Sequence, residues 1–156
     1  SFVARLTSWD GRDYDARIVR VMPKRELALL KSAPIAGGRS VRFADSAKLS
    51  KGDFALAIGT PNRRMGVATL GRIRLPNIGE RLDYGPWGFD NGIEISMEVG
   101  NGHSGGPVID AKGGLIGIVA GYELGDTTKT PYVSPRITYV VPSNGIAAFL
   151  RAAGTR

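Results

Sequence analysis

Short strand-like segments separated by turn residues constrain the fold of this chain more than any other feature. The 156 residues include 22 glycines and 9 prolines, and apolar or alternating runs recur between them. Their spacing of about 8–12 residues is typical of antiparallel sandwiches and barrels. The clearest runs are residues 14–21, 54–59, 67–75, 93–97, 115–121 and 136–141. The sequence therefore predicts an all-β chain with an antiparallel barrel architecture.

Three local signals refine this prediction. Asp10–Gly11, between the first two strand-like runs, predicts a tight hairpin. Residues 76–91 are rich in glycine, proline and aromatic side chains and predict a long loop. Only residues 146–151 have a helical pattern, with Ser143 or Asn144 available as the N-cap, so we expect one short C-terminal helix.

The charge and the side-chain inventory exclude several kinds of site. The net charge is +7, yet the basic residues are scattered, and the densest pairs are Lys24–Arg25 and Arg63–Arg64. Nucleic-acid binding needs basic residues clustered on one face, so a nucleic-acid-binding barrel is the weaker alternative and we expect no such partner. With no cysteine and one histidine, thiolate and multi-histidine metal sites cannot form. We expect no metal, no cofactor and no apolar stretch of the ~18 residues that a membrane-spanning helix needs.

The segment Gly-His-Ser-Gly-Gly-Pro at residues 102–107 is the strongest candidate for chemistry. Acyl transfer by serine needs an exposed hydroxyl on a tight turn and backbone N–H groups that converge on the developing oxyanion. Gly102 allows a peptide orientation that a side chain would hinder, so its N–H can join that of Ser104 in an oxyanion hole. Taken alone, the segment is also compatible with a glycine-rich turn that carries an incidental serine.

Four segments, in the same order, resemble the trypsin-like serine proteases and most closely their HtrA/Deg branch. Residues 102–110 are similar to the Gly-Asn-Ser-Gly-Gly-Pro nucleophile segment of that branch, and residues 114–118 to the strand that follows it. Residues 52–61 resemble its Gly-Asp-x-x-x-Ala-Ile-Gly-Asn-Pro segment, and residues 137–144 resemble Gly-Phe-Ala-Ile-Pro-Ser-Asn. As a set these segments are specific, and they extend over nearly the whole chain.

The resemblance implies two packed β-barrels with a catalytic cleft between them. In this chain the first barrel would be incomplete, with residues 1–50 as its remainder, residues 51–142 as the second barrel and residues 143–156 as the terminal helix. The implied activity is that of a bacterial serine endopeptidase that cleaves polypeptides through an acyl-enzyme on Ser104. The resemblance also favours a periplasmic or secreted protein, and it allows a homo-oligomer.

The same resemblance places Glu26 at the acidic position of the catalytic triad. The family has Asp-Leu-Ala-x-Leu-Lys there, with an aspartate that orients the histidine, and this chain has Glu-Leu-Ala-Leu-Leu-Lys at residues 26–31. Glutamate can hold an imidazole, although its reach differs by one methylene. A surface glutamate at the start of a strand is the alternative.

The family's Thr-x-x-His-Val segment, which supplies the general base, has no counterpart here. The sole histidine, His103, directly precedes Ser104. Side chains of neighbouring turn residues diverge, so we expect His103 to pack behind the turn rather than act as the base. Two explanations stay open. Either an N-terminal segment outside this sequence supplies the first strands and the histidine, which we favour, or the protein is a degenerate protease that binds peptides without cutting them.

The resemblance also suggests how a peptide binds. Thr138, Tyr139 and Val140 are expected to pair with the main chain of an extended substrate. Glu98 and Asn101 match one wall of the primary specificity pocket. Glu98 would attract a basic side chain if it points inward; the branch's usual preference for small or medium apolar residues, with Glu98 as a solvated charge, is the alternative.

Overall fold

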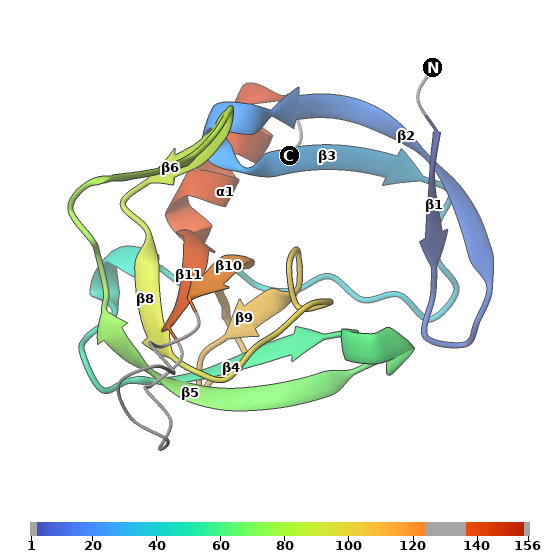
Figure 1. Cartoon of the computed structure of the whole chain (residues 1–156). Helices are drawn as coiled ribbons and strands as arrows, with labels where there is room; N and C mark the ends of the chain where they lie inside the picture. The colour runs from blue at the N-terminus through green and yellow to red at the C-terminus, as the bar shows by residue number, and fades with distance from the viewer. Residues whose placement is uncertain (1–2, 124–136, 155–156) are drawn as a thin grey trace.

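The computed structural model describes residues 3–123 and 137–154. In Figure 1 an open sheet arches over one side of a closed barrel, and helix α1 lies between the two. The open sheet has the order β1-β2-β3 and is built from β1 (Val3–Thr7), β2 (Asp13–Met22) and β3 (Leu27–Ser32). Within the described part of the chain, no strand pairs with the outer edge of β1 or of β3.

The first hairpin forms where the Asp-Gly signal predicts it. Ser8 N donates to Arg12 O at 2.8 Å, and Gly11 adopts a φ of +80°, which glycine tolerates without steric cost. Between β2 and β3 the chain makes the 3₁₀ turn η1 (Pro23–Arg25), which ends at Glu26.

The barrel closes in the order β10-β11-β8-β5-β4-β9. Its strands are β4 (Phe54–Gly59), β5 (Val67–Leu75), β8 (Ile93–Ser96), β9 (Pro107–Ile109), β10 (Leu115–Glu123) and β11 (Ile137–Pro142). Alternate residues point inward, as the period of a strand requires. The interior is filled by branched side chains that include Ile73, Ile93, Ile95, Val108 and Val140.

A second apolar cluster joins the open sheet to the barrel. Helix α1 (Ser143–Ala152) contributes Ile146 and Phe149, which pack with Leu27 and Val141, and the Arg20 guanidinium lies over the Phe149 ring, 5.5 Å from its centroid. Burial of this apolar surface holds the sheet and the barrel in one arrangement.

Polar contacts hold the segment between the sheet and the barrel. Phe43 bridges to Leu115, and Asp45 precedes the 3₁₀ turn η2 (Ser46–Lys48), accepting from Ala47 N at 3.1 Å. The Asn144 side-chain amide donates to Asp45 at 2.8 Å and holds the pKa of Asp45 below its usual value. This contact connects the segment to the start of α1.

The all-β prediction, with a barrel and one terminal helix, is confirmed. The loop predicted for residues 76–91 is wrong, because β6 (Arg81–Tyr84) and β7 (Trp87–Asp90) pair there as a hairpin. The turn between these strands contains Gly85, at a φ of +62°. The glycine and proline residues of this stretch predicted a loop, although two short strands lie within it. The predicted caps are also wrong, because Ser143 is the first helical residue and its Oγ donates to Ala44 O at 2.7 Å. The domain limits at residues 50 and 142 stay predictions.

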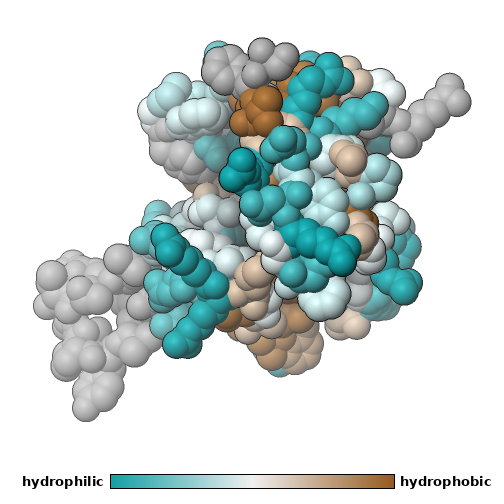
Figure 2. Space-filling view, turned by 90° about the vertical axis from the view of Figure 1, so that its right-hand side faces the viewer, coloured by the Kyte–Doolittle hydropathy of each residue, from teal (hydrophilic) through white to brown (hydrophobic). Residues whose placement is uncertain are grey.

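Apolar side chains are also present at the surface. The most exposed are Trp9 at 79%, Val3 at 64% and Leu70 at 63%. In Figure 2 the apolar residues of one face lie in separate patches at its upper and lower ends, with polar residues between them. Such scattered exposure is ordinary for a folded protein.

The barrel core gives the first testable prediction. Ile95 is fully buried on β8 between β5 and β11, so Ile95→Ala should lower the free energy of unfolding by about 2–5 kcal/mol, through lost burial and a residual cavity. The matched exposed position, Leu70→Ala, should change it by less than about 0.5 kcal/mol. Urea denaturation measures both, and equal losses would contradict the barrel assignment.

Candidate active site

Ser104 lies at the exposed apex of a glycine-rich turn between β8 and β9, hereafter the serine turn (residues 100–106). His103 N donates to Gly100 O at 3.1 Å, and Gly106 N donates to His103 O at 2.8 Å, so two successive turns reverse the chain. Gly102 and Gly105 have φ values of +97° and +81°. These left-handed conformations favour glycine and lift Ser104 out of the packed interior.

The serine turn is held from two sides by backbone hydrogen bonds. On one side, Thr60 N at the end of β4 donates to Gly102 O at 2.8 Å. On the other side, Gly105 N donates to Val119 O on β10 at 2.8 Å, and Val119 N donates to Gly106 O at 2.9 Å. A Cβ on Gly102 would lie 2.6 Å from Thr60 O, so the approach of the two backbones itself requires glycine.

Two amide groups of the turn stay available. Among the described residues, neither Gly102 N nor Ser104 N has a hydrogen-bond acceptor. Ser104 itself is exposed. A hydroxyl flanked by two unpaired N–H donors is the arrangement that can both attack a carbonyl carbon and stabilise the oxyanion that results.

His103 is buried behind the serine turn, as the sequence predicted, with 4% of its surface exposed. Its Nδ1 lies 3.2 Å from Gly100 O and its Nε2 lies 3.4 Å from Thr69 Oγ1. The ring packs on Gly59, where a Cβ would come within 2.7 Å of the ring atom Cδ2. Both ring nitrogens therefore have partners, one in the serine turn and one on β5, and no hydrogen bond joins them to Ser104 in the described part of the chain.

Glu26 lies outside the barrel, at the end of η1, which connects β2 and β3 of the open sheet. Its φ of 56° is left-handed, and its backbone N–H donates to Pro23 O at 3.1 Å. Burial raises the pKa of the Glu26 carboxyl group. Across the described residues, no hydrogen bond or ion pair links Glu26 to Ser104, so the structure does not bring these two predicted site residues into direct contact.

The remaining predicted residues divide into two groups. Asn101, within the serine turn, accepts a hydrogen bond from the Tyr122 hydroxyl at 2.9 Å, and Glu98 is exposed on the segment that leads into the turn. Thr138 is fully buried, and its Oγ1 donates to Met97 O at 3.1 Å.

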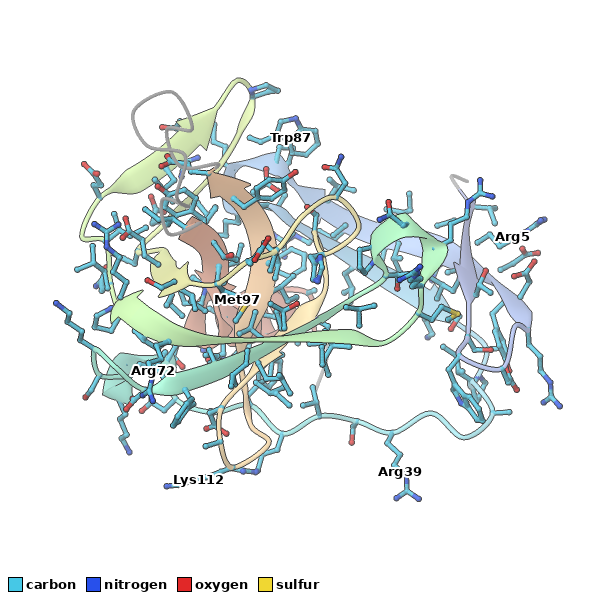
Figure 3. The ribbon with its side chains drawn as sticks, turned by 60° about the horizontal axis from the view of Figure 1, so that its bottom comes forward. Arg5, Arg39, Arg72, Trp87, Met97 and Lys112 are labelled. Carbon is cyan, nitrogen blue, oxygen red and sulfur yellow. The ribbon has the colours of Figure 1, made fainter. Side chains whose placement is uncertain are left out.

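Figure 3 shows two side chains that serve as reference points. Met97 points into the barrel, whereas Arg39, on the segment after β3, projects away from the body.

The expectation that a peptide pairs with Thr138, Tyr139 and Val140 needs correction. These residues pair with β10 on one side and with β8 on the other, so the strand has no free edge there. Strand composition could not reveal this, since internal and edge strands share the same alternation.

A free edge exists on β10 instead. Strand β9 pairs with β10 only as far as Ile118, and Gly105 and Gly106 extend that contact to Val119. Beyond this point, no described strand pairs with residues 120–123 on the side opposite β11. The free edge therefore begins directly beside the serine turn. No sequence pattern indicated this edge or the hydrogen bonds of Thr60 and Tyr122.

One cavity in the described part of the chain does not include Ser104 in its lining. It measures about 470 Å³ and is lined by residues of η1, η2, β7 and the start of α1, among them Arg25, Leu27, Phe89 and Asn144. None of the predicted site residues lines it. The part of the chain that the structure describes also contains no group of three or more His, Cys, Asp or Glu side chains arranged to hold a metal ion.

Comparison with known proteins agrees with this geometry. The trypsin-like peptidase domain family matches residues 1–118 of the chain. The chain belongs to the trypsin-like peptidases. Its relatives place it in the HtrA/Deg branch of that family.

Three bacterial relatives illustrate the match. A probable periplasmic serine endoprotease, DegP-like, from Brucella suis is 36% identical over 110 residues, which cover 70% of this chain and 21% of the relative. A probable periplasmic serine protease, do/HhoA-like, from Haemophilus influenzae is 31% identical over 140 residues, covering 86% and 28%. The periplasmic pH-dependent serine endoprotease DegQ of Escherichia coli is 34% identical over 110 residues, covering 70% and 23%. The matched part of the chain thus spans between 21% and 28% of the length of these relatives.

No helix in the described part of this trypsin-like chain has the length and apolar character needed to cross a membrane.

The contact between Gly59 and His103 gives the second prediction. Gly59→Ala would place a methyl group against the buried ring, so it should lower the free energy of unfolding by about 1–3 kcal/mol. Gly100→Ala, in the serine turn, has no neighbour within 4 Å of its added Cβ and should cause no comparable loss. Thermal or urea unfolding of the two variants decides, and an equal effect would show that His103 does not fill the space at Gly59.

Tyr139 gives a third prediction, about alkaline pH. Burial, then the hydrogen bond and charge of Glu123, then the charge of Glu94, raise the pKa of Tyr139 from 10.0 to about 12. A raised pKa favours the protonated folded state, so this contribution is complete below pH 10 and is lost as the pH rises toward about 12. Tyr139→Phe should therefore lose less unfolding free energy over that interval than the unaltered protein, as measured by urea denaturation. An unchanged pH dependence would contradict the assignment.

Proposed function

We propose that this chain is the nucleophile-bearing part of a serine endopeptidase that cleaves polypeptides through an acyl-enzyme on Ser104. The observation that supports this most directly is the exposed Ser104 hydroxyl beside the two unpaired amides of Gly102 and Ser104, in a trypsin-like chain. An oxyanion hole made of backbone N–H groups is worth several kcal/mol to acyl transfer.

The proposed reaction uses the groups as follows. Ser104 Oγ attacks the scissile carbonyl carbon and loses its proton to a base, while the carbonyl oxygen becomes an oxyanion that accepts from Gly102 N and Ser104 N. The C–N bond then breaks, the base returns the proton to the leaving amine, and an ester remains on Ser104. Water attacks that ester by the same route and releases the acid.

The base has to be an imidazole from outside these 156 residues. His103 is the sole histidine, and it is buried with its ring directed to Gly100 and Thr69. We assign Glu26 the role of orienting that imidazole. Without the base, the chain should retain only the small residual rate that substrate binding and the oxyanion hole provide.

Substrate binding is assigned to the free edge of β10 rather than to β11. A peptide paired with residues 120–122 would pass over the serine turn with its carbonyl groups facing the turn's amides, a β-augmentation mode. Glu98 and Asn101 are proposed as part of the pocket for the side chain that precedes the scissile bond. Because the relatives are described as periplasmic, we propose the same compartment for this protein.

A peptide-binding protein without activity is the second candidate. The burial of the sole histidine, His103, favours it, because the ring cannot serve Ser104 as a base. Such a protein would bind extended peptides along β10 but would never form an ester on Ser104.

The fourth prediction tests the nucleophile. A fluorophosphonate probe should label the full-length protein that contains this chain, and Ser104→Ala should abolish the labelling, since only an activated serine reacts with such a probe. Ser40→Ala, at an exposed serine on the segment between sheet and barrel, should label normally. In-gel fluorescence measures all three.

The same proteins separate the two candidates. Degradation of casein by the full-length protein, lost in Ser104→Ala, would exclude the inactive binder. Absence of both labelling and degradation in a full-length protein that contains a second histidine would refute the endopeptidase.

A further inference from the structure

We propose that the loop between β4 and β5 receives acidic residues on the carboxyl side of the peptide bond to be cleaved, with Arg63 and Arg64 as specificity-determining residues. The inference rests on the proposed function, because it takes Ser104 as the point at which the peptide is cut. It concerns the side of the serine turn that no predicted substrate residue occupies.

The direction of the peptide follows from the two sides of the serine turn. Val119 of β10 holds one side, and the free edge of β10 begins directly beyond it. Thr60 holds the other side through its bond to Gly102 O. A peptide that enters along β10 and crosses Ser104 therefore leaves over the loop that starts at Thr60.

That loop is in contact with the proposed oxyanion hole. A Cβ on Gly102 would lie 2.6 Å from Thr60 O and 2.8 Å from the Cα of Pro61. The next residues, Arg63 and Arg64, are exposed. Two residues with guanidinium groups thus follow Thr60 and Pro61, the residues that contact Gly102, within three or four positions in the sequence.

The loop keeps Asn62 and Arg63 in an unfavourable backbone conformation, whereas Arg64 is extended. Asn62 and Arg63 have φ values of 50° and 62°, and a left-handed conformation costs a residue with a Cβ roughly 1–2 kcal/mol. Asparagine tolerates it better than arginine does. The loop closes through Arg64 N, which donates to Pro61 O at 2.9 Å. Strain retained next to a reactive turn is typical of functional loops.

The charges of the loop are not neutralised within the described chain. The six ion pairs found among those residues involve Arg5, Arg12, Lys48, Arg74 and Arg81, and neither Arg63 nor Arg64. On the opposite side of the turn, strand β10 ends with the carboxylate of Glu123. A bound peptide would meet negative charge before the scissile bond and positive charge after it. Arginine is well suited to this role, since its fork of N–H groups matches a carboxylate.

The fifth prediction is a binding preference that depends on position. Two fluorescent peptides share an apolar centre; one carries aspartate and glutamate on the carboxyl side of that centre, and the other carries asparagine and glutamine. The full-length Ser104→Ala protein, which cannot cut them, should bind the acidic peptide roughly 3- to 10-fold more tightly by fluorescence anisotropy at low salt, and the preference should shrink as salt is added. A third peptide, with the acidic residues on the amino side, should bind no more tightly than the neutral peptide, because negative charge lies on that side of the turn.

Two variants assign the effect to the loop. Adding Arg63→Gln and Arg64→Gln should remove the preference and leave the affinity for the neutral peptide unchanged, whereas Arg39→Gln, at an exposed arginine on another segment, should keep it. A preference that survives the double substitution, or that is equal for acidic residues on either side, would overturn the inference. Fluorophosphonate labelling of the same proteins with Ser104 restored separates the two ideas. Labelling without an acidic preference rejects the loop assignment alone, and a preference without labelling rejects the endopeptidase and, with it, the role in cleavage specificity.

Discussion

The position of Ser104 depends on backbone hydrogen bonds that tie the serine turn to the barrel, from Thr60, directly after β4, to Gly102 on one side and with Val119 of β10 on the other. The two hydrogen bonds within the turn do not by themselves fix it against the rest of the chain, because the turn is short and its glycines are conformationally free. Strand β9 pairs with both β4 and β10, so closure of the barrel brings both partners to the turn. The two amides beside Ser104 are therefore oriented by the whole barrel, and catalytic groups held in this way need no reorganisation when charge develops.

His103 is of the residue type that often acts as a general base, but here it is part of the packing of the barrel. A buried imidazole is costly unless its nitrogens find partners, and here Gly100 and Thr69 supply them while Gly59 leaves room for the ring. The ring thus fills the space beneath the serine turn and supports it from inside. Its contribution is to packing: it supports Ser104, the proposed nucleophile, and does not supply a base.

Sequence patterns predicted the parts of this structure that depend on local periodicity. Alternating runs predicted the strands, Asp10–Gly11 predicted the first hairpin, and the glycines around Ser104 predicted an exposed turn with His103 behind it. The expectation for Thr138–Val140 had no local basis, because alternation does not tell whether both edges of a strand are occupied. That property is set by pairing with β8 and β10, which are distant in sequence. The hairpin of β6 and β7 was not predicted, because its strands have only four residues each and the glycine and proline residues around them indicate a loop.

The open sheet and the barrel meet through contacts that bear on Glu26. Arg81 donates to Lys24 O at 3.1 Å and so joins the β6–β7 hairpin to η1, while Leu27, directly after Glu26, is buried with Phe89 and α1. These contacts hold Glu26 in a half-buried position where burial raises its pKa. Burial disfavours the charged carboxylate, and a neighbouring cation opposes that effect. In the proposed reaction, an ionised Glu26 and a protonated imidazole at this junction would therefore stabilise each other, and Glu26 would act fully only when that imidazole is present.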